Sequence, residues 1–181
     1  MIHYKRSVLR SELEQILELQ KQNIPEAISP EEKAKEGFVT VHHELDILTR
    51  MNDVCSHVIA VSDNRVVGYA LCMHPQFEQE IAVLRPMFIE IKKHLSPDTS
   101  FLVMGQICIE KAFRKQGIFR GLYKHMQEVT RTHFDVIITE VDLKNLRSLH
   151  AHYAVGFEPL ASYRSGGQDW ELIVLRPSDR A

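Results

Sequence analysis

The sequence predicts an α/β fold with a mixed central sheet, for two reasons. Apolar, β-rich runs alternate along the chain with segments whose apolar residues recur at helical spacing. Two of the runs, 101–109 and 136–141, are almost wholly apolar and are separated by a helical segment, as expected for a central pair of parallel strands joined by a right-handed crossover. The 181 residues, 44% of them hydrophobic, suffice for one full core. We therefore expect one domain over 1–181, with helices on both faces of the sheet.

The N-terminal part predicts a strand, several helices and a hairpin. Residues 2–8 alternate weakly between polar and apolar, as in a short strand. Ser11 and Glu14 have the spacing of a capping box and predict the start of a helix that ends near Asn23. The next elements expected are a helix start at 29–32, an amphipathic helix over 40–51, and strands 56–62 and 66–73 joined by a turn at 63–65.

A long helical segment, 76–95, separates the third expected strand from the fourth. Its apolar spacing continues across Pro86, so we expect a helix that is kinked or divided there. This insertion could pack on the sheet, line an acceptor site or form a dimer contact, and core packing is the simplest of these. The remaining elements expected are a helix opening at 117, the strand 136–141, a helix over about 145–155, and a hairpin of strands 159–164 and 170–175 about Gly166-Gly167.

The turn after strand 101–109 has the properties of an anion site. The first turn of a helix leaves backbone N–H groups unpaired and carries the positive end of the helix dipole. Gly117 would let a phosphate approach the backbone, and Arg114, Lys115 and Arg120 add positive charge. A solvated basic turn without a ligand is the alternative reading of these residues.

A resemblance to a known family favours a bound anion at this turn over a solvated turn without a ligand. Residues 114–119, Arg-Lys-Gln-Gly-Ile-Phe, resemble the Arg/Gln-x-x-Gly-x-Gly/Ala signature of the GCN5-related N-acetyltransferases, the GNAT superfamily, although Phe119 replaces the small residue. The order of elements also resembles the GNAT order, except for the helical insertion between the third and fourth strands. The resemblance implies acetyl-CoA as cosubstrate, with its pantetheine arm beside the strand and its pyrophosphate on the loop. The residues implied are Ile107, Cys108 and Ile109 on the strand, and Arg114, Lys115, Gln116, Gly117, Ile118, Phe119 and Arg120 on the loop.

A second block lies in the helix expected near 145–155. Asn145, Ser148 and His152 share one helical face, while Leu146, Leu149 and Tyr153 share another. This block resembles the GNAT Asn-x-x-Ser/Ala helix followed by Gly-Phe, which implies that Asn145 and Ser148 lie against the coenzyme. His152 stands where many members have a tyrosine general acid, and could protonate the leaving thiolate, contact the coenzyme or bond locally. Tyr153 could be the acid only if the helix were rotated by about 100°.

Glu140 is a carboxylate in an otherwise apolar strand, so it needs a hydrogen-bond partner or a functional cavity. In some GNAT members the glutamate at this place is a general base, which implies that role for Glu140; a purely structural partnership is the alternative. The implied reaction is direct attack of an amine on the thioester in a ternary complex, without a covalent intermediate. Cys108 fits an inert core thiol better than an acetylated nucleophile.

The composition of the chain argues against several other classes of function. A net charge of −2 and the absence of an apolar run long enough for a membrane span favour neither a nucleic-acid nor a membrane partner. The three cysteines and ten histidines show no metal-ligand spacing, so we expect no metal site. We expect a cytoplasmic monomer or homodimer acting on a small-molecule or peptide amine. A non-catalytic acyl-CoA-binding module is the competing hypothesis.

Overall fold

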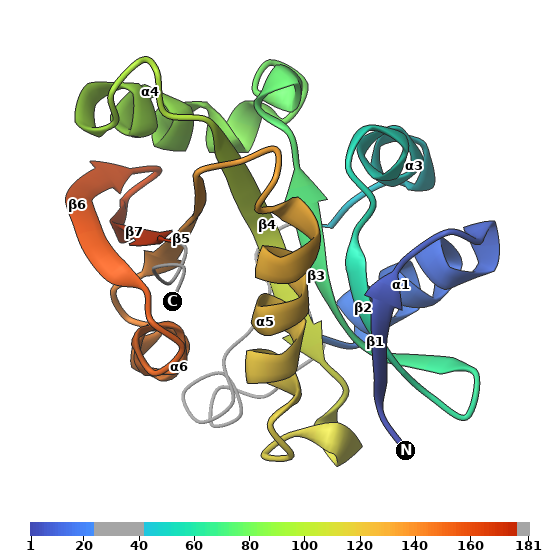
Figure 1. Cartoon of the computed structure of the whole chain (residues 1–181). Helices are drawn as coiled ribbons and strands as arrows, with labels where there is room; N and C mark the ends of the chain where they lie inside the picture. Colours follow the sequence, from blue (N-terminus) through green and yellow to red (C-terminus); the bar gives the residue numbers. More distant parts are fainter. Residues whose placement is uncertain (24–41, 177–181) are drawn as a thin grey trace. The chain divides into compact units, whose positions relative to one another are not determined.

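The computed structural model describes residues 1–23 and 42–176. The helix start expected at 29–32 and the first residues of the helix expected over 40–51 lie outside these ranges. The helices are α1 (Arg10–Asn23), α3 (Leu45–Val54), α4 (Arg85–His94), α5 (Ile118–Thr130) and α6 (Leu146–Tyr153), and the strands are β1 (His3–Arg6), β2 (Val58–Ser62), β3 (Arg65–Met73), β4 (Phe101–Ile109), β5 (Val136–Asp142), β6 (Glu158–Ser165) and β7 (Gln168–Leu175) (Figure 1).

The expected mixed sheet is confirmed. The strand order is β1-β2-β3-β4-β5-β7-β6, with β4 and β5 parallel and the pairs β1–β2, β2–β3, β5–β7 and β6–β7 antiparallel. The chain forms two compact units, one of Met1–Met73 with Met104–Glu128 and one of His74–Val103 with Val129–Ala181. Strand β4 therefore contributes its last residues to the first unit and its first residues to the second. The single domain expected over 1–181 stays a prediction.

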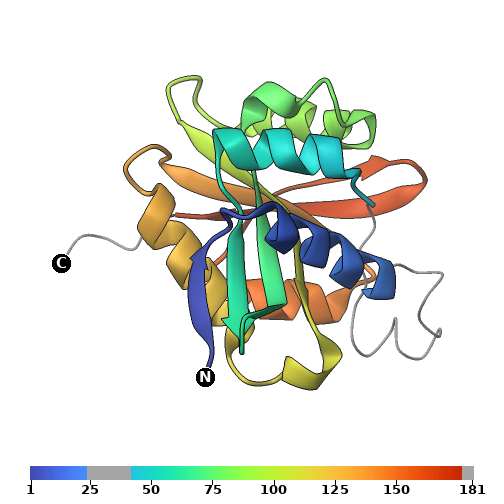
Figure 2. The ribbon, with the colours of Figure 1, turned by 90° about the vertical axis from the view of Figure 1, so that its right-hand side faces the viewer.

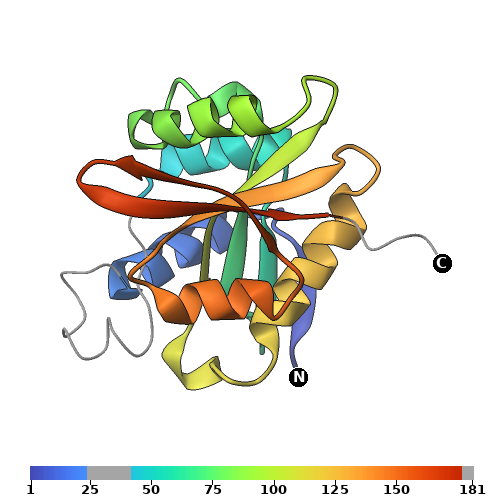
Figure 3. The ribbon, with the colours of Figure 1, turned by 90° about the vertical axis from the view of Figure 1, so that its left-hand side faces the viewer.

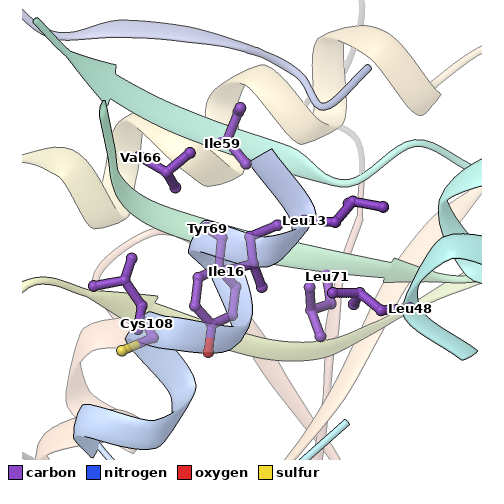
Figure 4. Close-up of a cluster of buried hydrophobic side chains, with 9 residues drawn as sticks. Leu13, Ile16, Leu48, Ile59, Val66, Tyr69, Leu71 and Cys108 are labelled. Carbon is purple, nitrogen blue, oxygen red and sulfur yellow. The ribbon is translucent and has the colours of Figure 1, made fainter. Parts of the chain in front are cut away.

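The first unit has an apolar core between α1, α3 and the strands β2 and β3. Figure 2 shows both helices in front of these strands. The side chains drawn in Figure 4 come from all of these elements and from the end of β4. Ile16, Leu48 and Tyr69 are among those with no exposed surface. Full burial of an apolar side chain of this size contributes about 1.5–3 kcal/mol per side chain, so the cluster anchors the helices to the sheet.

Helix α1 begins differently from the prediction. It starts at Arg10, and the capping carboxylate belongs to Glu12, whose Oε2 accepts hydrogen bonds from the backbone N–H groups of Val8 (2.8 Å) and Leu9 (3.0 Å). The capping box expected from Ser11 and Glu14 is therefore wrong. Glu12 sits three residues after Leu9 and makes the glutamate half of such a box, because that spacing returns the carboxylate to the free amides before the helix.

The hairpin between β2 and β3 follows the prediction closely. Asp63 and Asn64 have φ values of 49° and 60°, the left-handed pair that a two-residue type I′ turn requires. Arg65, expected in the turn, is the first residue of β3. Helix α3 starts at Leu45 and ends at Val54, so the helix expected to end at residue 51 extends three residues further.

The second unit contains the strands β5, β7 and β6, with a helix on each face of this part of the sheet. The first residues of β4 also belong to this unit. Figure 3 shows α4 on one side of the β6–β7 hairpin and α6 on the other. Strand β5 pairs with β7 over Ile137–Asp142, and with β4 over Val136–Ile138. The hairpin turns at Gly166 and Gly167, with φ values of 58° and 77°, as expected.

The insertion between β3 and β4 is two short 3₁₀ turns, Pro75–Phe77 and Ala82–Leu84, followed by α4. The segment expected over 76–95 is therefore divided at Pro86, as one of the two alternatives predicted, although the part before Pro86 forms 3₁₀ turns rather than a helix. Pro86 lies in the first turn of α4, where a proline disrupts no hydrogen bond, because those N–H groups have no partner within the helix.

The insertion packs on the sheet of its own unit. Phe88 of α4 lies 6.4 Å, centroid to centroid, from Phe101, and Met87, Phe88 and Ile91 are buried. Helix α4 contacts both β6 and β7. This agrees with core packing, the simplest of the three expected roles. Among the described residues no helix is long and apolar enough to cross a membrane.

Candidate functional site

The loop between β4 and α5 presents backbone donors. It runs through a short 3₁₀ turn, Lys111–Phe113, and then takes left-handed φ values at Lys115 (62°) and Gly117 (78°) before α5 begins at Ile118. The N–H groups of Gln116, Gly117 and Ile118 donate to no residue among those that the structure describes. These amides lie at the N-terminal end of α5, which carries the positive end of the helix dipole. This is the arrangement that binds a phosphate group.

Gly117 leaves room for a ligand. A Cβ built on it would meet nothing within 4 Å, and its positive φ is one that other residues rarely adopt. Gly121, one turn later, differs: a Cβ there would overlap the Tyr4 ring. Helix α5 therefore lies close to Tyr4 of β1 at Gly121 but not at Gly117. Gly117 instead keeps the loop backbone uncovered.

Side chains from the same unit hold this loop in place. Arg65 of β3 forms an ion pair with Glu110 (2.7 Å) and lies 5.7 Å from the centre of the Phe113 ring. The Arg114 guanidinium donates from Nε to the Ile109 carbonyl oxygen (3.1 Å) and from Nη2 to Oδ1 of Asn23 (2.7 Å). Arg114 was expected to face the pyrophosphate; in the structure its hydrogen bonds tie the loop to β4 and α1.

The other predicted loop residues divide by exposure. Lys115, Gln116 and Arg120 are exposed, and Gln116 donates from its side chain to the Ala112 carbonyl oxygen (3.2 Å). Ile118 is buried, while Phe119 is partly buried and packs edge-on against Tyr123 at 5.2 Å. Ile118 therefore anchors the helix start, and only its backbone N–H faces the loop.

At the end of β4 the side chains alternate between partly exposed and buried. Ile107 and Ile109 are partly exposed, whereas Cys108 is buried in the apolar cluster of the first unit. Burial raises the pKa of the Cys108 thiol to about 11. The thiol is therefore protonated near pH 7, and a protonated thiol is a poor nucleophile.

A second set of groups surrounds Glu140 in the other unit. Glu140 lies on β5 opposite Leu172 of β7, and the Tyr163 hydroxyl of β6 donates a hydrogen bond to its Oε2. Burial raises the pKa of Glu140 to about 7, although the bond from Tyr163 opposes that rise. A carboxylate that titrates near neutral pH can accept a proton from an amine and release it again.

The Tyr163 phenol also lies near a carboxylate from the insertion. Burial, followed by the negative charges of Glu140 and Glu90, raises the pKa of Tyr163, so its hydroxyl stays protonated. Glu90 belongs to α4 and pairs with Lys93 at 2.7 Å. Neither Tyr163 nor Glu90 was predicted from the sequence as a site residue. The alternation of the hairpin could have placed Tyr163 on a sheet face, but no local signal pairs it with Glu140.

Helix α6 carries the second predicted block. Asn145 is its N-cap, and Oδ1 accepts a hydrogen bond from the Ser148 N–H (3.2 Å). The expected division of faces is wrong: Leu149 and His152 are buried together, whereas Leu146 and Tyr153 are exposed. The reason is that His152 has a local hydrogen-bond partner, so its ring can be buried without losing one.

His152 is held as a neutral ring. Its Nδ1 lies 2.7 Å from the Ser148 carbonyl oxygen, and its ring packs edge-on against Phe157 at 5.1 Å. Since a carbonyl only accepts, Nδ1 carries the proton. Burial lowers the pKa of His152 to about 4. The imidazole is therefore uncharged near pH 7.

Tyr153 is the other candidate acid. Its hydroxyl donates a hydrogen bond to the Glu171 carboxylate of β7. Burial, this bond and the charge of Glu171 together raise the pKa of Tyr153 to about 12. A phenol with this pKa stays protonated near neutral pH. No group of three or more His, Cys, Asp or Glu side chains within 1–23 and 42–176 could hold a metal ion.

Comparisons with known proteins identify relatives of this chain in sequence and in fold. The sequence matches the family described as "Acetyltransferase (GNAT) family" over residues 13–157. A comparison with curated proteins gave no match. The fold matches a chain of the NatC complex bound to Gag peptide and CoA (TM-score 0.68, 16% identity, covering 98% of this chain and 99% of that one). It also matches the ribosomal-protein-S18-alanine N-acetyltransferase from Escherichia coli (0.64, 11%, 100% and 97%) and yncA from Salmonella typhimurium, solved with its cofactor acetyl-CoA (0.65, 12%, 99% and 96%).

Proposed function

The chain belongs to the GNAT acetyltransferase family, and from this we propose that it is an N-acetyltransferase that moves the acetyl group of acetyl-CoA to an amine. Acetyl-CoA is the cosubstrate of the family. The acceptor would be a small-molecule or peptide amine that attacks the thioester directly in a ternary complex. The observation that carries the proposal is the row of backbone N–H groups at Gln116, Gly117 and Ile118, which have no partner among the described residues and stand at the start of α5.

The loop fits the coenzyme. We assign the pyrophosphate to these amides, with Lys115 and Arg120 supplying positive charge and Phe119 flanking the helix start. The absence of a Cβ at Gly117 allows the close approach. The pantetheine arm would lie along the backbone of Ile107–Ile109, and Asn145 and Ser148 remain predicted coenzyme contacts.

Glu140 would serve as the general base. An amine with a pKa near 10 is protonated at neutral pH and must lose a proton before it can attack. The neutral nitrogen then forms a bond to the acetyl carbon while the C–S bond breaks. The coenzyme leaves as a thiolate, and the nitrogen releases a second proton to solvent to give the neutral amide. Glu140, with a pKa of about 7, can take the amine's proton because its charged form is present at and above neutral pH.

The departing thiolate needs a proton. His152 is a weak candidate, because its ring is neutral and its N–H is bonded to Ser148. We therefore propose that His152 orients α6 and contacts the coenzyme, and that the proton comes from Tyr153 or from solvent. Replacement of Tyr153 by Phe separates these two sources: a fall in kcat assigns the proton to Tyr153, and an unchanged kcat assigns it to solvent.

The decisive experiment is acetyl transfer to a panel of amines. The protein is incubated with acetyl-CoA and either peptides with free N-termini or small primary amines, and both free thiol and acetylated acceptor are measured. We expect amine-dependent thiol release matched by product. Coenzyme binding with no turnover across the panel would instead identify a non-catalytic acyl-CoA-binding module, and no coenzyme binding would refute the proposal altogether.

A further inference from the structure

Tyr163 and Glu140 meet across an intervening strand. Glu140 on β5 pairs with Leu172 on β7, which in turn pairs with Ala161 on β6. Tyr163 is two residues beyond Ala161, so it shares the sheet face of Glu140, because side chains alternate between the two faces. Its hydroxyl reaches back over β7 to the carboxylate. The contact is therefore not a by-product of direct strand pairing.

The groups that face Glu140 are few. From β6 there is Tyr163; β7 contributes Leu172 and Trp170 on this face; and the paired start of β4, 101–103, is apolar. Helix α4 packs on the same hairpin and brings Glu90, whose carboxylate pairs with Lys93 (2.7 Å) and lies 3.7 Å from His94. On β5 itself, Asp142 shares this face and accepts a hydrogen bond from Gln168 (3.2 Å). Within 1–23 and 42–176, Tyr163 is thus the side chain that donates a hydrogen bond to Glu140.

We propose that Tyr163 is a positioning residue, whose hydroxyl keeps the Glu140 carboxylate ionised and fixed in one orientation toward the acceptor amine. The inference rests on the proposed role of Glu140 as general base. It adds that the Tyr163 hydroxyl keeps a partly buried carboxylate able to accept a proton near neutral pH. Tyr163 lies on β6, outside the recognised motifs.

The physical argument compares two opposing effects on Glu140. Burial favours the protonated acid, because a charge loses its hydration. A hydrogen bond donated to the carboxylate favours the ionised form, and the Tyr163 hydroxyl supplies that bond. Loss of the hydroxyl would leave the carboxylate just as buried but without its donor. Protonation would then extend to higher pH, and less of the base would be available at pH 7.

Replacement of Tyr163 by Phe isolates the hydroxyl, because the ring and its packing stay. The side-chain carboxyl of Glu140 is followed by ¹³C NMR in glutamate-labelled protein and assigned with Glu140→Gln. We expect the titration midpoint to move upward by about one pH unit in Tyr163→Phe. Tyr153→Phe is the matched control: it removes a phenol that donates to Glu171, so the Glu140 midpoint should stay in place. An unmoved midpoint in Tyr163→Phe overturns the inference.

The reaction provides a second, separate readout. In kcat/KM against pH, the acidic limb of Tyr163→Phe should shift upward by the same amount, and activity should recover toward the wild-type plateau at high pH. A uniform loss at every pH would mean that Tyr163 does not act through the ionisation of Glu140, and would overturn the inference. Wild-type protein without turnover would instead refute the proposed function, while the NMR titration would still test the contact.

Discussion

The loop between β4 and α5, to which we assign the coenzyme, and the cluster around Glu140 are built in opposite ways. In the loop, the groups offered to a ligand are backbone amides of the consecutive residues Gln116–Ile118, and their direction is set by two neighbouring left-handed residues, Lys115 and Gly117. In the cluster, the groups are side chains from three elements, Glu140 of β5, Tyr163 of β6 and Glu90 of α4. The first is local in sequence, and the second exists only once distant segments pack together.

The two regions also differ in charge and exposure. The loop is exposed and carries positive charge, so its donors are ready whatever the pH near neutrality. The cluster is partly buried and acidic, so its chemistry depends on the ionisation of a single carboxylate. This difference makes the two regions separable by experiment: changes at the loop should act on coenzyme affinity, and changes at the cluster on rate and pH dependence.

The largest effect should follow from Glu140→Gln. Loss of a general base reduces the rate by about 10²- to 10⁴-fold, and we expect kcat to fall by about 10²- to 10³-fold at pH 7.5. The coenzyme dissociation constant, measured by calorimetry, should not change. Glu158→Gln, the same substitution at an exposed position of β6, is the control. A large loss of coenzyme affinity in Glu140→Gln would show that the two regions are not separable.

The next largest effect concerns stability against pH. Because the folded-state pKa of Glu140, about 7, lies above the ordinary value of 4.5, the folded state binds more protons than the unfolded state between these pH values. Wild-type stability should therefore decline as pH rises through this window. Glu140→Gln cannot ionise at this position and should gain about 3 kcal/mol relative to wild type between pH 4 and pH 8 in urea unfolding. The same difference at both pH values would contradict the raised pKa.

A smaller effect is expected at the loop. Gly117→Ala adds a methyl group where the pyrophosphate should approach, and we expect the acetyl-CoA dissociation constant to rise about tenfold, the equivalent of one lost charged hydrogen bond. Gly166→Ala is matched to it: that glycine also has a positive φ (58°) and nothing within 4 Å of its Cβ position. Both variants should lose about 1 kcal/mol of stability from backbone strain. Equal coenzyme affinities in the two variants would remove the loop from the site.

The smallest effect should come from Arg65→Ala. The ion pair with Glu110 is at the surface, with the Arg65 side chain 55% exposed, so its loss should cost about 0.5 kcal/mol and raise the coenzyme dissociation constant about twofold. Arg164→Ala, which removes the exposed pair with Asp169 (3.8 Å), should match the stability change without the change in affinity. If the two variants bind coenzyme equally, the ion pair between Arg65 and Glu110 does not position the loop.

Local sequence was enough for the elements and turns that depend on near neighbours. Strand β4 was predicted at its observed bounds, and the turns at Asp63-Asn64 and Gly166-Gly167 followed from residues that tolerate positive φ. The start of α5 after Gly117 was also predictable. The start of α1 was predicted wrongly, because Glu12 rather than Glu14 provides the capping carboxylate. At Pro86 two outcomes were expected, a kink or a division, and the structure shows the division, with α4 beginning there.

The sequence by itself determined the order of strands and helices, the family and the loop to which we assign the coenzyme, because each depends on backbone conformation and on spacing within a few residues. Only the tertiary structure decided the pKa of Glu140, which hydroxyl donates a hydrogen bond to it, and that His152 is a buried neutral ring. Those properties depend on burial and on partners from other elements, and desolvation is set by everything that packs around a group rather than by its neighbours in the chain.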